Sequence, residues 1–298
     1  MREKVDVSII IVNYNTKILL DECLKSIYEY TKNLNFEILV SDNGSSDGSV
    51  KLIKTLYSQV ILIENNDNIG FGAANNRALA KAVGKYVFYL NSDTVLLNNA
   101  VKFFFDYFEE HSDESIGALG CMLLNKEGNI IHSGGKFPSY LHSFLSLYNC
   151  LAKQICCYKG REVTLKSLDK SCVDVDYVIG ADLFVLNNKE AAFDERFFMY
   201  SEEVDLQYQL SKGNLRRCLI TGPEIIHLCG GSETVKTVNY DFRKITQFYY
   251  WSSLLKYFKK NMYKPLQFYI LKKSVIFAFS VPWNIKVTRK FLRELKTC

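Results

Sequence analysis

The sequence predicts an α/β fold, with a doubly wound, mostly parallel sheet followed by a basic helical extension at the C-terminus. Over the first hundred residues, short apolar runs alternate with segments whose apolar residues recur at helical spacing. The chain has 298 residues, 48% of them apolar and 23% charged, which is enough to bury a large core. The predicted strands are residues 5–12, 36–40, 60–63 and 86–90, and the predicted helices are residues 17–31, 49–57 and 73–83.

Each of these elements follows from a local pattern. Residues 5–12 are almost entirely β-branched, as expected of a strand that is buried on both faces. Residues 17–31 place Leu20, Leu24 and Ile27 on one helical face. The later strands and helices repeat the same two patterns. Because the connections between them are short, the carboxyl ends of the strands are the expected ligand site.

Polar side chains follow the first two strands. Asn13 and Asn15 come directly after the first strand, where they can cap the next helix or contact a ligand. After the second strand, residues 41–48 contain two aspartates. Capping of the next helix accounts for Asp47 but leaves Asp42 without a role. A carboxylate at this position can accept the N3–H of a pyrimidine base.

The segment after the third strand is rich in groups that can approach phosphate and ribose. Residues 65–77 include Asn68, Gly70 and Arg77. The segment is not a dinucleotide-binding fingerprint, because Asn75 occupies the third glycine position and the fingerprint belongs after the first strand. The sequence also has no P-loop motif.

The fourth strand ends in Asn91, Ser92 and Asp93. A carboxylate at this edge suits a hard divalent cation, such as Mg²⁺ or Mn²⁺, that faces a nucleotide diphosphate. An isolated Asn-x-Asp is more often a solvated turn, but the polar segments around it favour a functional site. His227 ends another apolar run just before a Gly-Gly loop, and it is a second candidate ligand for metal or phosphate.

The second half of the chain supplies candidate catalytic acids. Residues 175–185 predict two short strands, and Asp182 between them is expected to face a cleft because an unpartnered buried acid is unfavourable. Glu202, Glu203 and Asp205 crowd three carboxylates beside aromatic residues. Repulsion and desolvation would raise the pKa of at least one of them, as a general base requires. A solvated helix face is the alternative interpretation.

The C-terminal segment differs in charge from the rest of the chain. Residues 236–298 carry 14 basic and two acidic side chains, a net charge of +12, whereas the remainder carries 23 basic and 30 acidic ones, a net charge of −7. Basic, aromatic helices are expected over residues 242–260 and 264–296. The longest apolar run, residues 274–283, is too short to span a membrane.

We therefore expect this extension to lie on an anionic membrane surface. Helices that pack on the catalytic domain, or on a second copy in a homo-oligomer, are the alternative. A nucleic-acid-binding module built on the basic tail is the alternative that involves no enzyme, although we expect no nucleic acid as a partner.

Cysteine usage and the N-terminus point to a cytoplasmic protein. The sequence has nine cysteines without CxxC spacing, and its first residues do not resemble a secretory signal. Most of these cysteines are expected to be reduced and to pack as small apolar residues.

In their order along the chain, the motifs resemble those of family 2 inverting glycosyltransferases, and most closely a bacterial rhamnosyltransferase-like branch that builds surface polysaccharides. The resemblance covers about residues 5–235. It implies a GT-A domain over residues 1–235, with a nucleotide-binding half at 1–97 and an acceptor and catalytic half at 98–235, before the extension at 236–298. The motifs are residues 8–15, 42–47, 68–70, 91–93, 180–182, 193–198 and 202–205, and His227.

The resemblance also implies roles. The donor would be a UDP- or dTDP-linked sugar with Mn²⁺ or Mg²⁺, and the acceptor a saccharide or a lipid-linked saccharide at the inner face of the cell membrane. Asp42 would bind the base, Asp93 and His227 the metal or the diphosphate, and Asp182 the acceptor. Glu203 would be the general base, with Glu202 or Asp205 as substitutes. The remaining donor-site residues would be Asn13, Asn15, Asn68, Gly70, Arg77 and Ser92.

This sequence departs from the family pattern at two positions. The metal motif is Asn-Ser-Asp and not Asp-x-Asp, so it offers one carboxylate, and the base position holds Glu where Asp is common. A glycoside hydrolase with paired carboxylates would leave the polar segments at Asp42 and residues 65–77 without a role. A non-catalytic relative that acts as an assembly partner is a further alternative.

Overall fold

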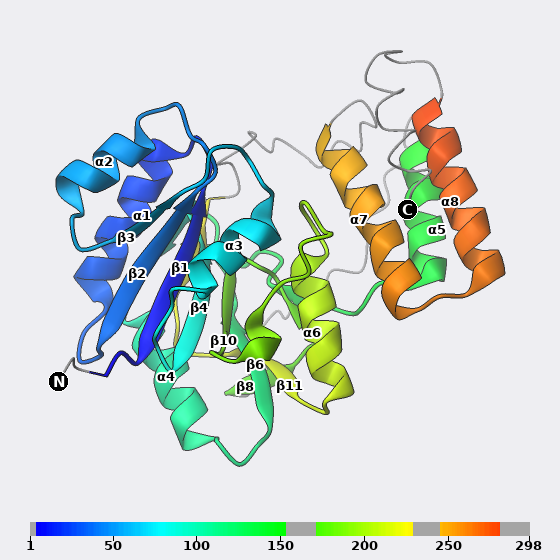
Figure 1. Ribbon diagram of the computed structural model, residues 1–298. Coiled ribbons are helices and arrows are strands. Elements are labelled where there is room, and N and C mark those ends of the chain that lie inside the picture. The colour runs from blue at the N-terminus through cyan, green and yellow to red at the C-terminus, as the bar shows by residue number, and fades with distance from the viewer. Residues whose placement is uncertain (1–3, 153–170, 229–244, 281–298) are drawn as a thin grey trace.

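The computed structural model describes residues 4–152, 171–228 and 245–280. Its centre is an eight-stranded sheet whose first half is parallel. In the order β3, β2, β1, β4, these strands are Ile61–Glu64, Phe36–Asp42, Val7–Asn13 and Tyr86–Asn91. The predicted doubly wound α/β fold is therefore present, with its carboxyl strand ends along one edge (Figure 1).

The second half of the sheet is mixed. After β4 come β10 (Asp182–Leu186), β6 (Ile116–Cys121), β11 (Arg216–Ile220) and, at the edge, β8 (Cys172–Asp174). Strand β10 is antiparallel to β4 and β6, β11 is parallel to β6, and β8 is antiparallel to β11. Two small sheets pair β5 (Thr94–Leu96) with β12 (Ile225–His227), and β7 (Gly134–Gly135) with β9 (Tyr177–Val178).

Helices cover both faces of the sheet because alternate residues of β1 point to opposite sides. Ile9 and Ile11 belong to one buried cluster and Ile10 to the other, and all three are fully buried. The first cluster includes α1 (Lys17–Tyr30), α2 (Ser49–Leu56) and α4 (Ala100–Glu110). The second includes α3 (Phe71–Leu79) and α6 (Glu202–Lys212), with the short 3₁₀ turn η1 (Lys189–Ala191) beside them.

All seven predicted elements before residue 90 are confirmed, with differences at their ends. The predicted helix at 73–83 begins earlier, at Phe71, and ends at Leu79. It ends there because the amide of Lys81 donates to the carbonyl of Ala78, three residues back, and the chain then turns into β4. Asp47 accepts hydrogen bonds from the amides of Ser49 and Lys17, so one carboxylate satisfies the starts of both α2 and α1.

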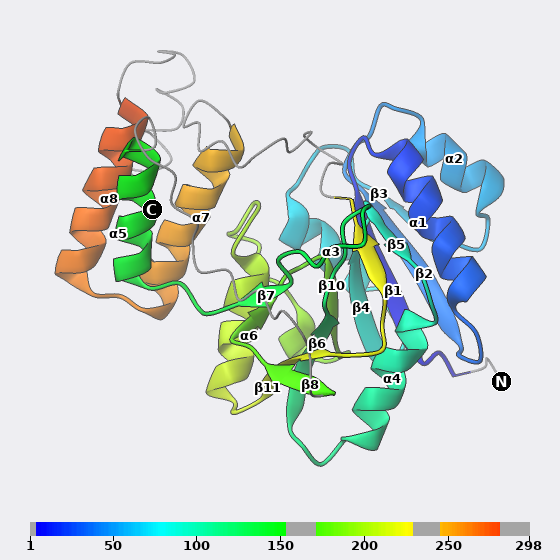
Figure 2. The same cartoon turned by 180° about the vertical axis from the view of Figure 1, so that it is seen from behind.

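A third buried cluster lies in a helical unit beside the sheet, next to α6 (Figures 1 and 2). The unit consists of α5 (Tyr140–Ala152), α7 (Ile245–Asn261) and α8 (Pro265–Ser280). Trp251 and Phe258 of α7 are fully buried in it. The unit therefore combines a helix from before the expected domain boundary at residue 235 with two from after it.

The helices predicted over 242–260 and 264–296 are confirmed within residues 245–280, and residues 242–244 and 281–298 lie outside the described part of the chain. Among the described helices, none combines the length and apolar composition that crossing a membrane requires.

Candidate active site

The candidate site lies at the carboxyl ends of β1, β2 and β4, as the sequence predicts. Asp42, the last residue of β2, is buried. Its Oδ2 accepts a hydrogen bond from Asn13 Nδ2 at 2.6 Å, and its Oδ1 accepts one from the Ser45 amide at 2.8 Å. These two donors fix the carboxylate and leave each oxygen one further lone pair for a ligand.

The other polar residues of the first loops bind one another. Thr16 Oγ1 donates to Asn13 Oδ1 at 2.6 Å and lies 2.9 Å from Ser92 Oγ, so Thr16 links the loops after β1 and β4. Asn15 has a left-handed φ of 55°, and its Oδ1 accepts the Ser46 amide at 2.8 Å. Asn13, Asn15 and Ser92 therefore build the wall of the site.

An asparagine network organises the loop after β3. Arg77 Nη1 donates to Asn65 Oδ1 at 2.7 Å, and Asn65 Nδ2 donates to Asn43 Oδ1 at 2.9 Å. Asn43 Nδ2 in turn donates to Asn68 Oδ1 at 3.3 Å, and the same oxygen accepts the Gly70 amide at 3.0 Å. Asn43 and Asn65 are not among the residues predicted from the sequence, although the run of asparagines after two neighbouring strands is a signal that indicates them.

Gly70 fits a position that no other residue could occupy. Its φ is +92°, and an added Cβ would lie 2.5 Å from the carbonyl oxygen of Phe198. The amide of Phe71 donates to the same oxygen at 2.9 Å. The loop after β3 is therefore in direct backbone contact with the segment that leads into α6.

Asp93 and His227 meet through the small sheet of β5 and β12, in which Thr94 pairs with His227. Asp93 Oδ1 lies 3.2 Å from His227 Nε2, and both side chains are mostly buried. Asn91 Nδ2 lies 3.4 Å from the same nitrogen. A carboxylate and an imidazole at this separation are a donor pair that suits a divalent ion such as Mn²⁺.

Glu202 and Glu203 begin α6, and the two residues before them, Tyr200 and Ser201, both have left-handed backbone angles, with φ of 68° and 66°. The Oε2 atoms of both glutamates are buried, and neither has a hydrogen-bond partner within the described residues. Burial raises the pKa of both carboxyls, and Glu203 raises that of Glu202 further.

Glu203 lies beside Gly180 in the turn before β10, and Gly180 also neighbours Phe71 at the start of α3. A Cβ added to Gly180 would lie 3.6 Å from Glu203 Cβ and 3.6 Å from Phe71 Cε1. A carboxyl whose pKa is raised, and whose Oε2 has no hydrogen-bond partner in the described part of the chain, has the properties that proton abstraction requires.

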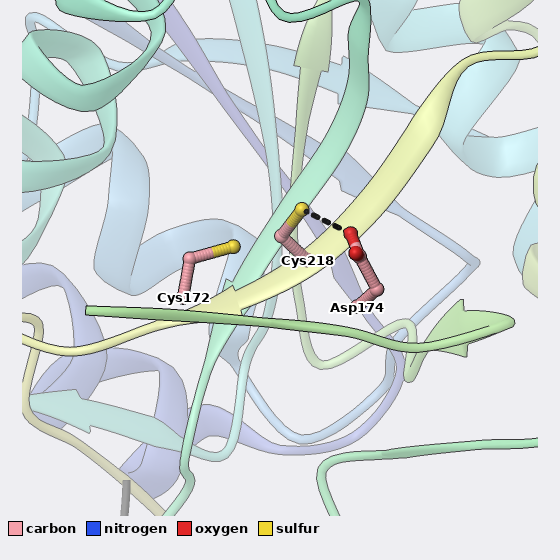
Figure 3. A group of neighbouring side chains, drawn as sticks. All are labelled: Cys172, Asp174 and Cys218. Atoms are coloured by element: carbon pink, nitrogen blue, oxygen red, sulfur yellow. Dashed lines mark hydrogen bonds between the residues drawn. The ribbon is translucent and has the colours of Figure 1, made fainter. Parts of the chain in front are cut away.

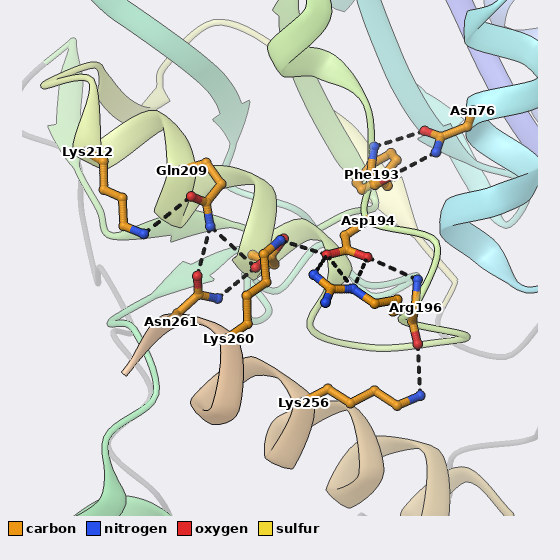
Figure 4. A network of polar contacts seen from close by, with 10 residues as sticks. Asn76, Phe193, Asp194, Arg196, Gln209, Lys212, Lys256, Lys260 and Asn261 are labelled. Carbon is orange, nitrogen blue, oxygen red and sulfur yellow. Dashed lines mark hydrogen bonds and ion pairs between the residues drawn. The ribbon is translucent and has the colours of Figure 1, made fainter. Parts of the chain in front are cut away.

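Asp205, the third sequence candidate for the base, belongs to an ion-pair network (Figure 4). Its Oδ2 lies 2.7 Å from Lys260 Nζ of α7, and its Oδ1 accepts a hydrogen bond from Asn261 Nδ2 at 2.7 Å. Lys260 also pairs with Asp194 at 2.7 Å. Asp205 is buried and fully engaged, which leaves Glu202 and Glu203 as candidates.

Three further hydrogen bonds join α7 to α6 and to the segment that precedes α6. Ser253 Oγ donates to the carbonyl of Met199, and Lys256 Nζ donates to that of Arg196, both at 2.8 Å. Gln209 Nε2 of α6 donates to Asn261 Oδ1 at 2.8 Å. No pattern in the sequence predicts this network, because its partners lie more than 50 residues apart.

The expectation that Asp182 faces a cleft is wrong. The side chain is fully buried inside the sheet, where Oδ2 accepts the amide of Cys121 at 2.7 Å. Its Oδ1 has no hydrogen-bond partner in the described part of the chain. Burial raises the pKa of this carboxyl to about 8, so it stays neutral at physiological pH, and that neutrality makes its burial tolerable.

Comparison with known proteins finds a family match over part of the chain. Residues 8–120 match the model of the glycosyl transferase family 2. The chain is 26% identical over 208 residues to the N-acetylglucosaminyl-diphospho-decaprenol L-rhamnosyltransferase of Mycobacterium tuberculosis, a match that covers 64% of this chain and 66% of the relative. The chain thus spans slightly less than two thirds of that relative's length.

Two solved structures show the same fold. Staphylococcus aureus TarS 1–349 in complex with UDP has a TM-score of 0.52 and 13% identity, and the match covers 98% of this chain and 71% of TarS 1–349. The mannosyltransferase PcManGT from Pyrobaculum calidifontis, in complex with GDP-Man and Mn²⁺, has a TM-score of 0.54 and 16% identity over 99% of this chain and 74% of PcManGT. Residues 8–120 therefore match the glycosyl transferase family 2, and the chain has the fold of GT-A glycosyltransferases.

Proposed function

We propose that the protein is an inverting glycosyltransferase that moves a sugar from a UDP- or dTDP-linked donor to a saccharide or lipid-linked saccharide in surface polysaccharide synthesis. The observation that carries the proposal is the pair Glu202 and Glu203, whose Oε2 atoms are buried without hydrogen-bond partners among the described residues and which lie beside Gly72 and Gly180. The alternative of a non-catalytic assembly partner gives these two carboxyls no use.

In the proposed reaction, Glu203 accepts the proton of an acceptor hydroxyl. The acceptor oxygen forms a bond to C1 of the donor sugar from the face opposite the diphosphate. The bond between C1 and the diphosphate oxygen breaks, and its electron pair leaves with the diphosphate. Burial supports the role of Glu203, since a raised pKa makes it a stronger base than an exposed glutamate.

The residues at the strand ends would hold the donor. Asp42 accepts the N3–H of uracil or thymine through its remaining lone pairs, while Asn13 and Ser45 keep it oriented. Asp93 and His227 would hold a divalent ion, which neutralises the negative charge that develops on the departing diphosphate. The UDP bound by TarS 1–349 supports a uridine nucleotide, and the Mn²⁺ bound with GDP-Man by PcManGT supports the divalent ion.

A lipid-linked acceptor would bring the protein to the inner face of the cell membrane, and the helical unit has a suitable surface. Leu266, Tyr269 and Phe277 of α8 and Leu141 of α5 are exposed. Lysines 264, 272 and 273 on or next to α8 add the positive charge that anionic lipids attract. The relative that acts on a decaprenol-linked sugar supports the same placement.

The test of the proposed function is a donor panel. UDP- and dTDP-sugars are added with Mn²⁺ to wild type, Asp93→Asn and Glu203→Gln, and the melting temperature is measured. We expect one nucleotide series to stabilise the wild type and Glu203→Gln but not Asp93→Asn, and only the wild type to transfer sugar. If no nucleotide sugar stabilises the folded wild type, the proposal is wrong.

A further inference from the structure

A second candidate site lies on the far edge of the sheet, where β8 pairs with β11. Cys218 is opposite Asp174, and Ile220 is opposite Cys172. Because side chains alternate along a strand, Cys172, Asp174 and Cys218 all project from the same face of the sheet. Their ligand atoms lie within 4.8 Å of one another (Figure 3).

We propose that Cys172, Asp174 and Cys218 bind Zn²⁺ or a similar thiophilic divalent ion, which ties the edge strand β8 to β11. Two sulfur atoms and one carboxylate oxygen are a donor set suited to zinc and unlike the oxygen-rich sets that magnesium prefers. The inference does not depend on the proposed glycosyl transfer.

The geometry of the cluster fits such an ion. Zinc–sulfur bonds of about 2.3 Å in a tetrahedral site place two sulfur atoms roughly 3.8 Å apart, and a sulfur and an oxygen slightly closer. Cys218 Sγ lies 3.3 Å from Asp174 Oδ1, and no pair of ligand atoms is farther apart than 4.8 Å. Side-chain rotations that move the ligand atoms by about 1 Å would complete the site without moving the strands.

The charges around the cluster also fit. Two thiolates, one carboxylate and a divalent ion sum to a charge of −1, and Arg216 lies beside them. Its Nε is 3.0 Å from Asp174 Oδ1, and its Nη2 is 4.0 Å from Cys172 Sγ. Arg216 also pairs with Glu114, which fixes its guanidinium from the other side. A cation held in this way offsets part of the negative charge of the complex and orients the carboxylate.

The three ligand side chains differ in their exposure to solvent. Cys218 is buried, Cys172 is half-buried and Asp174 is exposed. An ion can therefore enter from the side of Asp174, and a water molecule can complete its coordination there. Packing of two small apolar residues would not account for an exposed aspartate that accepts the hydrogen bond of a buried thiol.

The experiment measures zinc retained by the folded protein after dialysis under a phosphine reductant, which prevents a disulfide between Cys172 and Cys218. We expect one Zn²⁺ per chain in the wild type, lost in Cys172→Ser and Cys218→Ser and more weakly held in Asp174→Asn. The matched controls are Cys23→Ala, which removes a buried thiol elsewhere, and His227→Ala, which removes a ligand of the other candidate metal site.

A second readout locates the ion. Titration with Cd²⁺ should give a thiolate-to-metal charge-transfer band in the wild type and in both controls, but not in either serine variant. If Cys218→Ser does not fold, Cys172→Ser decides, because its side chain is only half-buried. A folded wild type that retains no zinc, or a Cys172→Ser variant that retains as much zinc and gives the same band, would refute the proposal.

Discussion

Glu203 carries the clearest prediction at the scale of single residues. Glu203→Gln should lower kcat by about 10²–10⁴-fold and leave donor binding intact, because the amide keeps the shape of the side chain but cannot accept the proton. Steady-state kinetics and donor titration check the two parts. Glu202→Gln is the matched control, and an equal loss in both variants would mean that the pair acts as one unit.

The pH dependence of the reaction follows from the same burial. The base must be ionised to act, and its pKa is raised above the ordinary value of 4.5. The acidic limb of the kcat/KM profile should therefore lie at higher pH than for an exposed glutamate, and activity should rise as pH increases through it. A limb at or below pH 4.5 would contradict the assignment of Glu203.

The raised pKa of Asp182 predicts that the free energy of unfolding depends on pH. Its pKa is about 8 in the folded protein against 3.8 in the unfolded chain, so the folded state holds a proton that the unfolded state releases. The contribution of this group is complete below pH 4 and is lost as pH rises towards 8. Asp182→Asn should remove that loss, so that the variant gains stability relative to wild type as pH increases.

The measurement for Asp182 is urea unfolding of both proteins across this pH range. Asparagine keeps an oxygen for the Cys121 amide, so the hydrogen bond at 2.7 Å survives the change. A constant difference in the free energy of unfolding at all pH values would show that Asp182 does not titrate in this range.

At the scale of elements, Lys260 is the residue that joins α7 to α6. Lys260→Met leaves Asp205 buried without its cation and should lower the free energy of unfolding by about 3 kcal/mol. The double variant with Asp205→Asn should recover part of that loss, since no unpaired carboxylate then remains at Asp205. Urea denaturation measures both.

An exposed ion pair provides the comparison for Lys260. Lys25 pairs with Asp21 on the surface of α1, where the lysine side chain is 64% exposed. Lys25→Met should change stability by no more than about 0.5 kcal/mol. Equal effects of the two lysine substitutions would mean that the network around Asp205 contributes no more than a surface pair.

The elements of the first hundred residues could be predicted because their patterns are local. The β-branched run of β1 and the apolar face of α1 are each encoded within a few turns or strand positions. The placement of Asp42 and Asp93 at one sheet edge follows from the topology that those patterns imply.

The rest depends on contacts between distant segments, which no local pattern encodes. Lys260 meets Asp205 across 55 residues, and Cys172 lies near Cys218 only because β8 and β11 pair. The burial of Asp182 depends on β10 lying between β4 and β6, an order that the sequence does not state. Asn43 and Asn65 could have been found had the asparagine run been treated as one network.

At the scale of the whole molecule, the helical unit predicts membrane binding. The double variant Leu266→Glu and Phe277→Glu should lose binding to vesicles that contain phosphatidylglycerol, since each apolar side chain contributes roughly 2 kcal/mol when buried. Binding to neutral vesicles should be weaker, because the lysines then meet no anionic headgroups. Vesicle flotation measures both effects.

Leu56→Glu is the control for that experiment, because Leu56 is a similarly exposed apolar residue on α2, far from the helical unit in Figure 1. A wild type that ignores anionic vesicles and forms dimers which the double variant breaks would contradict the membrane proposal and identify the surface as a subunit interface.

The close approach of Gly70 to Phe198 has a consequence for the order of events during turnover. The loop after β3 and the segment that leads to Glu203 are in backbone contact. The conformation of each therefore depends on that of the other. A nucleotide sugar that orders the loop after β3 would also order the segment that leads to Glu203. The acceptor would then bind to a site that is already formed. We expect a compulsory sequence in which the donor enters first and the nucleotide leaves last, visible as competitive product inhibition by the nucleotide against the donor alone.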